Sequence, residues 1–98
     1  MTIDAELLAP FRRYADSGEI NSVVEDPVGR IEAIAIRYAD GTQDRTDGLT
    51  VEFPDWWANV RASNTEPLLR LNVEARTQEL LDERTAELLS LIRGEGGT

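Results

Sequence analysis

The clearest structural signal in this sequence is an unbroken alternation of apolar and polar residues from position 69 to position 75. Leu69, Leu71, Val73 and Ala75 fall on one side of an extended chain, and Arg70, Asn72 and Glu74 fall on the other. Successive side chains of a strand point to opposite faces, so this segment predicts a strand that buries one face. The rest of the chain must supply neighbouring strands and a cover for that apolar face.

Three further strands are predicted upstream. Residues 49–53 and 56–61 alternate in the same way, and the Pro54-Asp55 pair between them is typical of a turn, so the two segments indicate a hairpin. Residues 18–25 are short, rich in β-branched side chains and bounded by glycine and proline, as a first strand should be.

Two segments have the apolar spacing of helices. The first begins with Asp26 as its N-cap and Pro27 at its first position, and Asp40-Gly41 ends it. The second begins after Thr77 and ends before Gly94, a glycine in the position that follows many helices. The resulting order, β-α-β-β-β-α, predicts an α+β fold of two layers, with a mostly antiparallel four-stranded sheet covered by two helices.

The composition limits the classes of function that this chain can have. Its 98 residues allow one domain with a small core, and 10 cationic against 19 acidic residues give a net charge of −9. This charge disfavours nucleic acid and anionic membranes as partners. The chain has no Cys and no His, which excludes disulfides, Ser-His and Cys-His nucleophiles and zinc sites built from these ligands.

The amino-terminal residues show no basic region followed by a long apolar run. We therefore expect neither a signal peptide nor a membrane span, and a cytoplasmic protein is the default expectation.

The best candidate for a binding site is Arg61-Ala62-Ser63-Asn64-Thr65-Glu66-Pro67, a polar loop between two predicted strands. A tight loop presents several backbone N–H groups in one direction, to which the polar side chains add further donors. Arg61 adds a planar cation, and the whole set matches the oxygens of a phosphate monoester. In the alternative interpretation, the loop's hydroxyl and amide groups only satisfy their own backbone.

Three other features have simpler interpretations. The Asp40–Arg45 segment loosely resembles an acidic metal loop, but Thr42 stands where a magnesium site needs a carboxylate, so we expect no metal there. Trp56 and Trp57 point to opposite faces of one strand, so we expect one in the core and the other at an edge or interface. The last helix carries an acidic, solvated face formed by Glu79, Glu83 and Glu87.

Residues 47–75 resemble the C-terminal domain of the phosphomannomutase/phosphoglucomutase family. The resemblance rests on Asp47-Gly48-Leu49-Thr50-Val51-Glu52-Phe53 and on the run from Trp56 through the 61–67 loop to Ala75. It extends over residues 16–94, and leaves 1–15 as a lead-in or hinge from a preceding domain and 95–98 as a disordered tail. In that family the domain is similar in fold to the TATA-binding-protein superfamily, which fits the predicted order of elements.

Members of this family are four-domain cytoplasmic enzymes that interconvert hexose 1-phosphates and hexose 6-phosphates, and their fourth domain holds the phosphate that does not react. The resemblance implies a phosphosugar substrate and the other domains of the same polypeptide as partners. It also implies residues that bind the substrate phosphate: Arg61, Ser63, Asn64 and Thr65. Two further residues are expected to shape the loop, namely Glu66 and Pro67.

Two catalytic segments of the family have no counterpart in this sequence. The family's phosphoserine lies near a His, and its magnesium loop carries three Asp residues, whereas this chain has no His and lacks the middle acid at positions 40–45. We therefore expect no catalytic residue, metal or cofactor in this chain, with Mg²⁺ implied for a full-length enzyme. The alternative is a stand-alone phosphate-binding or protein-interaction module that uses the exposed Trp and the acidic helix as its surface.

Overall fold

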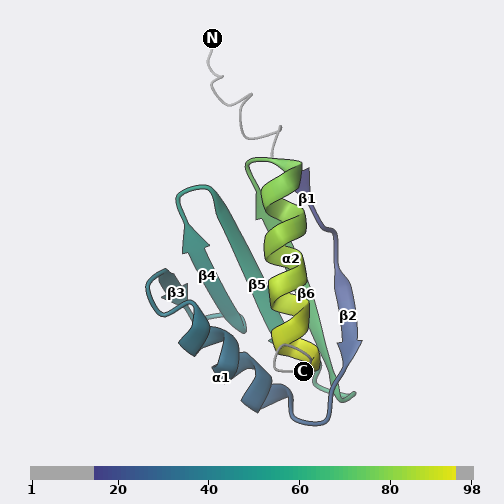
Figure 1. The fold of residues 1–98 in the computed structure, drawn as a ribbon. Helices are drawn as coiled ribbons and strands as arrows, with labels where there is room; N and C mark the ends of the chain where they lie inside the picture. The colour runs from purple at the N-terminus through teal and green to yellow at the C-terminus, as the bar shows by residue number, and fades with distance from the viewer. Residues whose placement is uncertain (1–14, 95–98) are drawn as a thin grey trace.

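The computed structural model describes residues 15–94, so almost all of the predicted 1–15 lead-in and the whole 95–98 tail lie outside the described residues. Figure 1 shows the elements in chain order. They are β1 (Ala15–Asp16), β2 (Ile20–Val23), α1 (Pro27–Arg37), β3 (Thr42–Asp44), β4 (Leu49–Phe53), β5 (Trp56–Ala62), β6 (Leu68–Ala75) and α2 (Gln78–Arg93).

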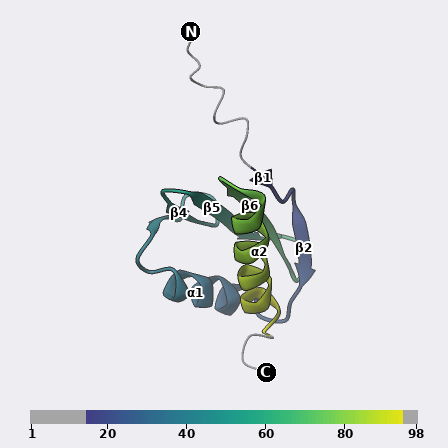
Figure 2. The same cartoon turned by 45° about the horizontal axis from the view of Figure 1, so that its top comes forward.

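The strands form one antiparallel sheet. Strands β3, β4, β5 and β6 follow one another across it, and β1 and β2 both pair with the outer side of β6. Both helices lie on the same face of this sheet (Figure 2). The predicted two-layer α+β fold is therefore confirmed. Strands β1 and β3 were not predicted, because two or three residues are too few to give a recognisable alternation.

The helix ends follow from local chemistry. Asp26 Oδ1 accepts a hydrogen bond from Gly29 N–H at 3.1 Å, and Pro27 occupies the first turn of α1. Thr77 Oγ1 accepts from Leu80 N–H at 3.1 Å, and α2 ends at Gly94, whose φ of 73° is left-handed. These caps confirm both predicted helix starts and the predicted end of α2. Helix α1 ends at Arg37, with Tyr38 as its C-cap, before the predicted end at Asp40-Gly41.

The core lies between the sheet and the helices. The apolar side of β6 is completely buried, as the alternating pattern predicted, and the helices contribute Ile34, Leu88 and Ile92. Trp56 is also buried, and its ring stacks on Phe53 with centroids 5.0 Å apart. Trp57 points to the other side of the sheet, so the prediction of one core tryptophan is confirmed.

Candidate functional site

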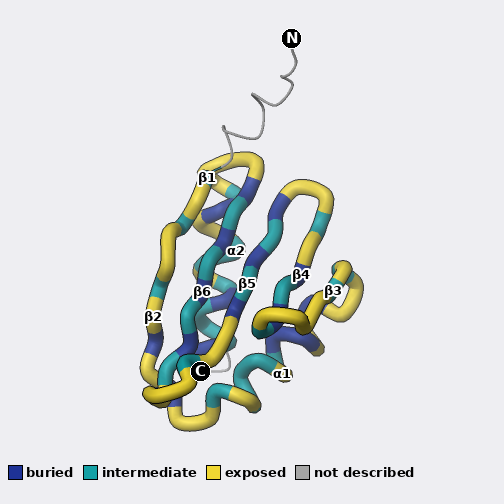
Figure 3. Tube along the Cα trace, turned by 180° about the vertical axis from the view of Figure 1, so that it is seen from behind, coloured by how far each residue is buried: buried dark blue, intermediate teal, exposed yellow. Residues whose placement is uncertain are grey.

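The two helices leave the second face of the sheet open. Figure 3 looks onto this face, where buried and half-buried residues alternate along β5 and β6. The side chains of these two strands that belong to the open face are Trp57, Asn59, Arg61, Arg70, Asn72 and Glu74. A candidate site for a polar ligand therefore lies on the side away from the helices.

Two arginines stand opposite each other where β5 ends and β6 begins. The register pairs Arg61 with Arg70, so both guanidinium groups extend from the same face. Together with the loop residues 63–65 they line a hollow of about 530 Å³. Like charges directly opposite each other destabilise a strand pair, so this position favours an anion that lies near both.

Among the described residues, each arginine has one carboxylate within ion-pair distance. Arg61 Nη1 lies 3.3 Å from Asp47 Oδ2, and Arg70 Nη1 lies 3.5 Å from Glu19 Oε2. Exposed ion pairs of this kind contribute little to stability. Since a guanidinium has five N–H donors, both cations keep donors for a ligand.

Gly48 brings the turn before β4 close to β5. Its φ is 72°, and a Cβ added to it would lie 2.5 Å from both the Val60 carbonyl oxygen and Arg61 Cβ. Only glycine accepts this conformation and this approach without strain. Asn59 Nδ2 donates to the Asp47 carbonyl oxygen at 2.9 Å and holds the turn in place. The turn thereby forms one side of the hollow beside Arg61.

The loop between β5 and β6 is closed by its own hydrogen bonds. The N–H groups of Thr65 and Glu66 both donate to Ser63 Oγ at 3.3 Å, and Ser63 N–H donates to the Leu68 carbonyl oxygen at 3.0 Å. Two of the backbone N–H groups that were expected to face a ligand therefore bind Ser63 Oγ instead. This agrees with the alternative interpretation, in which the polar groups of the loop satisfy its own backbone. The Ser63 O–H, the Asn64 amide and the Thr65 hydroxyl remain available as donors.

The backbone carbonyl groups of Glu66 and Pro67 accept hydrogen bonds at the end of this loop. The Glu66 carbonyl oxygen accepts from Leu68 N–H at 2.8 Å in a three-residue turn centred on Pro67, whose fixed φ suits that position. The Pro67 carbonyl oxygen accepts from Val24 N–H at 2.8 Å, which ties the loop to the chain just beyond β2. The assignment of the loop to a phosphate stays a prediction.

Arg70 and Asp47 also line this site, and neither was predicted to belong to it. Arg70 is visible in the sequence only as one polar residue of the alternating run. Its place opposite Arg61 depends on the register of β5 against β6. One signal in the sequence could have indicated this pairing. A short loop between two paired strands brings the residues on either side of it together, here Arg61 and Arg70.

The Asp40–Arg45 segment supports the end of α1. Gln43 Nε2 donates to the carbonyl oxygens of Ala35 at 2.9 Å and Tyr38 at 3.0 Å, where the last turn of the helix lacks internal partners. Residues 15–94 contain no group of three or more side chains that could hold a metal ion. The Mg²⁺ implied for a full-length enzyme stays a prediction.

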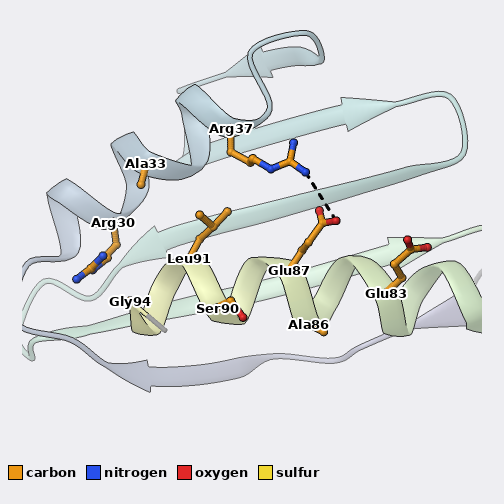
Figure 4. Close-up of a pocket in the computed structure, with 9 residues that line it drawn as sticks. All are labelled: Arg30, Ala33, Arg37, Glu83, Ala86, Glu87, Ser90, Leu91 and Gly94. Carbon is orange, nitrogen blue, oxygen red and sulfur yellow. Dashed lines mark ion pairs between the residues drawn. The ribbon is translucent and has the colours of Figure 1, made fainter. Parts of the chain in front are cut away.

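A larger hollow of about 800 Å³ lies between the two helices (Figure 4). Arg37 extends from α1 toward Glu87 of α2, with 3.8 Å between Nη2 and Oε2. Glu87 Oε1 also accepts from Arg84 Nη1 at 3.1 Å and from Tyr38 Oη at 2.5 Å. These groups bind one another, so we interpret this cluster as the link between the helices. Glu87, predicted on the solvated face of the last helix, is instead half-buried within it.

The ionisation of this cluster follows from its contacts. Burial opposes ionisation of Glu87, but the hydrogen bond from Tyr38 and the guanidinium groups of Arg84 and Arg37 outweigh burial, so the pKa of Glu87 lies below its ordinary value. Burial and the neighbouring Glu87 raise the pKa of Tyr38 well above its ordinary value. The cluster therefore holds a neutral phenol beside a carboxylate.

Trp57, predicted to be exposed, is half-buried, and it does not share a surface with the acidic helix. Trp57 belongs to the open face, where its Nε1 donates to Glu74 Oε1 at 2.8 Å. The acidic residues of α2 lie in the other layer, on the far side of the sheet. A single interaction surface that combines both features is therefore not formed by one side of this molecule.

Comparison with known proteins identifies the family. Residues 19–91 match the family described as phosphoglucomutase/phosphomannomutase, C-terminal domain. The chain belongs to this family. This membership confirms the resemblance inferred from the 47–75 segment. No described helix is long and apolar enough to cross a membrane.

Several phosphohexomutases are similar to this member of the family. A phosphomannomutase of Salmonella montevideo is 48% identical over 82 residues, which cover 81% of this chain and 18% of the relative. A protein of Xanthomonas campestris pv. campestris named for phosphohexose mutases is 44% identical over 89 residues, covering 88% of this chain and 20% of the relative. A phosphomannomutase of Methanocaldococcus jannaschii is 40% identical over 88 residues, covering 90% of this chain and 20% of the relative.

A solved structure supports the same assignment. The phosphoglucomutase/phosphomannomutase family protein from Burkholderia thailandensis superimposes with a TM-score of 0.60 at 26% sequence identity, covering 87% of this chain and 19% of that protein. This chain spans about a fifth of the length of the curated relatives that it matches.

Proposed function

We propose that this chain is the substrate-phosphate-binding domain of a phosphomannomutase/phosphoglucomutase that interconverts hexose 1-phosphate and hexose 6-phosphate. The observation that carries the proposal is the direct pairing of Arg61 with Arg70 across two central strands. Both cations line one polar hollow together with the donors of the loop. A phosphate dianion placed there would relieve the repulsion between the arginines and accept charge-assisted hydrogen bonds from both.

The role of these residues is to hold a phosphate group, and the sheet makes that grip rigid. Arg61 and Arg70 extend from paired strands, and the hydrogen bonds of the loop fix its backbone. A reactant held in a fixed position loses less entropy in the reaction step. We infer that the phosphate held here is the one that does not react, since the chain has no His-flanked serine segment and residues 15–94 lack a metal-ligand cluster.

The test is an amide-shift titration of the ¹⁵N-labelled chain with inorganic phosphate. We expect shifts concentrated at residues 61–67 and at Arg70. The Arg61→Ala variant should weaken phosphate binding at least about tenfold, since hydrogen bonds to charged groups contribute about 1.5–3 kcal/mol. Arg30→Ala, a change of the same charge on α1 in the other layer, is the matched control and should bind as the original chain does. Shifts away from the loop, or equal affinities of both variants, would contradict the proposal.

The same proposal predicts that the chain alone does not convert one hexose phosphate into another. A coupled assay of mannose 1-phosphate conversion, with the 98-residue chain as the only added mutase, measures this directly. Turnover that persists after purification and disappears in Arg61→Ala would show that the chain carries catalytic groups of its own.

A further inference from the structure

The hollow between the two helices has opposite charges at its two ends. Arg30 lies at one end and Glu83 at the other, as Figure 4 shows. Within residues 15–94, no ion pair joins either of these side chains to another charged group. Arg37 and Glu87, which lie between them, are paired with each other. The charges at the two ends are therefore the ones that a partner molecule could bind.

Arg30 extends across the hollow to the end of α2. Its Nη2 lies so close to Gly94 that a Cβ added to this glycine would be 2.7 Å away. The dipole of a helix favours a cation beside its last turn, which accounts for this position. Arg30 and Glu83 therefore both lie along α2, about 16 Å apart in the direction of the helix axis.

The surface between these two charges is suited to contact with another protein. Ala33, Ala86 and Leu91 line the hollow. Ile36, which neighbours Ala33 one turn later on α1, is 76% exposed. A large apolar side chain that is this exposed gains free energy when a partner covers it. Ala86 and Ser90 are small, so a second helix can approach α2 closely at this point.

A second copy of this chain would bind both charges at once. A two-fold axis perpendicular to α2, between Ala86 and Ser90, places the two α2 helices antiparallel in contact. Each Arg30 then meets the Glu83 of the other copy, so the two ion pairs form together. The same surface serves both copies, as in most homodimers. An unrelated partner would need its own acid and base at the same spacing.

We propose that the outer side of α2, together with Arg30 and Ile36 of α1, is a surface at which two copies of this chain associate as a two-fold dimer. The helices are about 16 Å and about 24 Å long and about 10 Å wide, so they present about 400 Å² in projection to a partner. Stable interfaces bury about 800 Å² on each partner, so this dimer is a weak one. It leaves the open face and its arginines uncovered, so association and phosphate binding are independent.

Analytical ultracentrifugation of the 98-residue chain measures the association, at concentrations from about 10 μM to about 1 mM that suit a weak dimer. The buffer contains about 0.15 M salt, which screens the repulsion between two chains of net charge −9 beyond about 8 Å. Arg30→Glu and Glu83→Arg should each weaken self-association at least about tenfold, because each variant places like charges opposite each other twice in the dimer.

An equimolar mixture of these two variants gives the sharpest test. In a mixed dimer, each position 30 lies opposite a position 83 of the other sign, so the mixture should associate as the original chain does. Ile36→Ser should weaken association about threefold to tenfold, as expected for the loss of apolar contact. Val28→Ser is its matched control, because Val28 is 69% exposed on the same helix but lies two residues before Arg30, on the side turned away from the hollow.

Circular dichroism of each variant establishes that the fold is intact, and each should bind inorganic phosphate as the original chain does. An original chain that stays monomeric up to about 1 mM would overturn the proposal. A mixture that associates no better than its two components would overturn it as well. A dimer that every variant forms equally would place the contact elsewhere in the molecule and would also contradict it.

Discussion

Replacing Gly48 by alanine should destabilise the protein and disturb the phosphate hollow. The new Cβ would lie 2.5 Å from the Val60 carbonyl oxygen and from Arg61 Cβ, and 2.9 Å from Arg61 Cα. Two of these contacts are with the backbone of β5, which cannot move aside without breaking its pairing with β4 and β6. Gly18 provides a matched control, because its φ of 68° is nearly the same and a Cβ there would meet nothing within 4 Å.

The comparison separates backbone strain from steric overlap. Both variants adopt a left-handed conformation that costs an L-residue about 1–2 kcal/mol, and both gain about 0.4–1 kcal/mol because the unfolded chain loses conformational freedom. Gly18→Ala should therefore lose roughly 1 kcal/mol. Gly48→Ala should lose an additional 1–3 kcal/mol or so, the usual cost of overpacking.

Urea unfolding followed by circular dichroism measures both values. With a slope of about 1 kcal/mol per molar urea, the midpoint of Gly48→Ala should lie at least about 1 M below that of Gly18→Ala. Phosphate binding should weaken in Gly48→Ala only. Equal midpoints for the two variants would refute the argument that Gly48 is required for the close approach of the turn to Arg61.

Three more predictions follow from contacts described above. Asp47→Asn removes the carboxylate beside Arg61, so the affinity for inorganic phosphate should rise about twofold to fivefold in a calorimetric titration; a decrease would mean that Asp47 orients the cation for binding. Because the pKa of Glu87 is lower in the native state than the unfolded value of 4.5, its ionisation stabilises the native state at pH values above 4.5. This contribution is lost as the pH falls through the folded pKa, so the melting temperature should fall less steeply between about pH 6 and about pH 3 for Glu87→Gln than for the original chain. Leu88 is completely buried, so Leu88→Ala should cost about 2–5 kcal/mol and lower the melting temperature by at least about 8 °C in a calorimetric scan.

The elements of the fold could be predicted because their signals are local. Asp26 and Thr77 each cap a helix a few residues away, and the alternation at 69–75 assigns the buried side of β6 without knowledge of its neighbours. One tryptophan of the Trp56-Trp57 pair could be expected in the core for the same reason, because adjacent residues of a strand point to opposite faces. Such signals need only the geometry of one helix turn or one strand.

The site could be predicted only in part, because it depends on contacts between strands. The 61–67 loop was recognisable from its residues, but the direction of its N–H groups depends on the rotation of the Ser63 side chain. The pairing of Arg61 with Arg70 depends on register, which a single strand does not determine. Strand β3 was missed because Gln43, whose amide bonds to α1, is its one side chain directed toward the helices.

The position of β6 has a consequence for the order in which the sheet assembles. Strands β3 to β6 follow one another through short turns, whereas β2 joins β6 only after nearly half of the chain has been brought back, as in the pairing of Val23 with Leu68. Closing the long segment between β2 and β6 costs more entropy than closing the short turns. We therefore expect strands β3 to β6 to pair first and β2 to be added late. Until then β6 presents an unpaired edge, and the register that completes the native sheet would equally accept β2 from a second molecule. Concentrated refolding is therefore the condition under which an exchanged dimer of this domain should be sought.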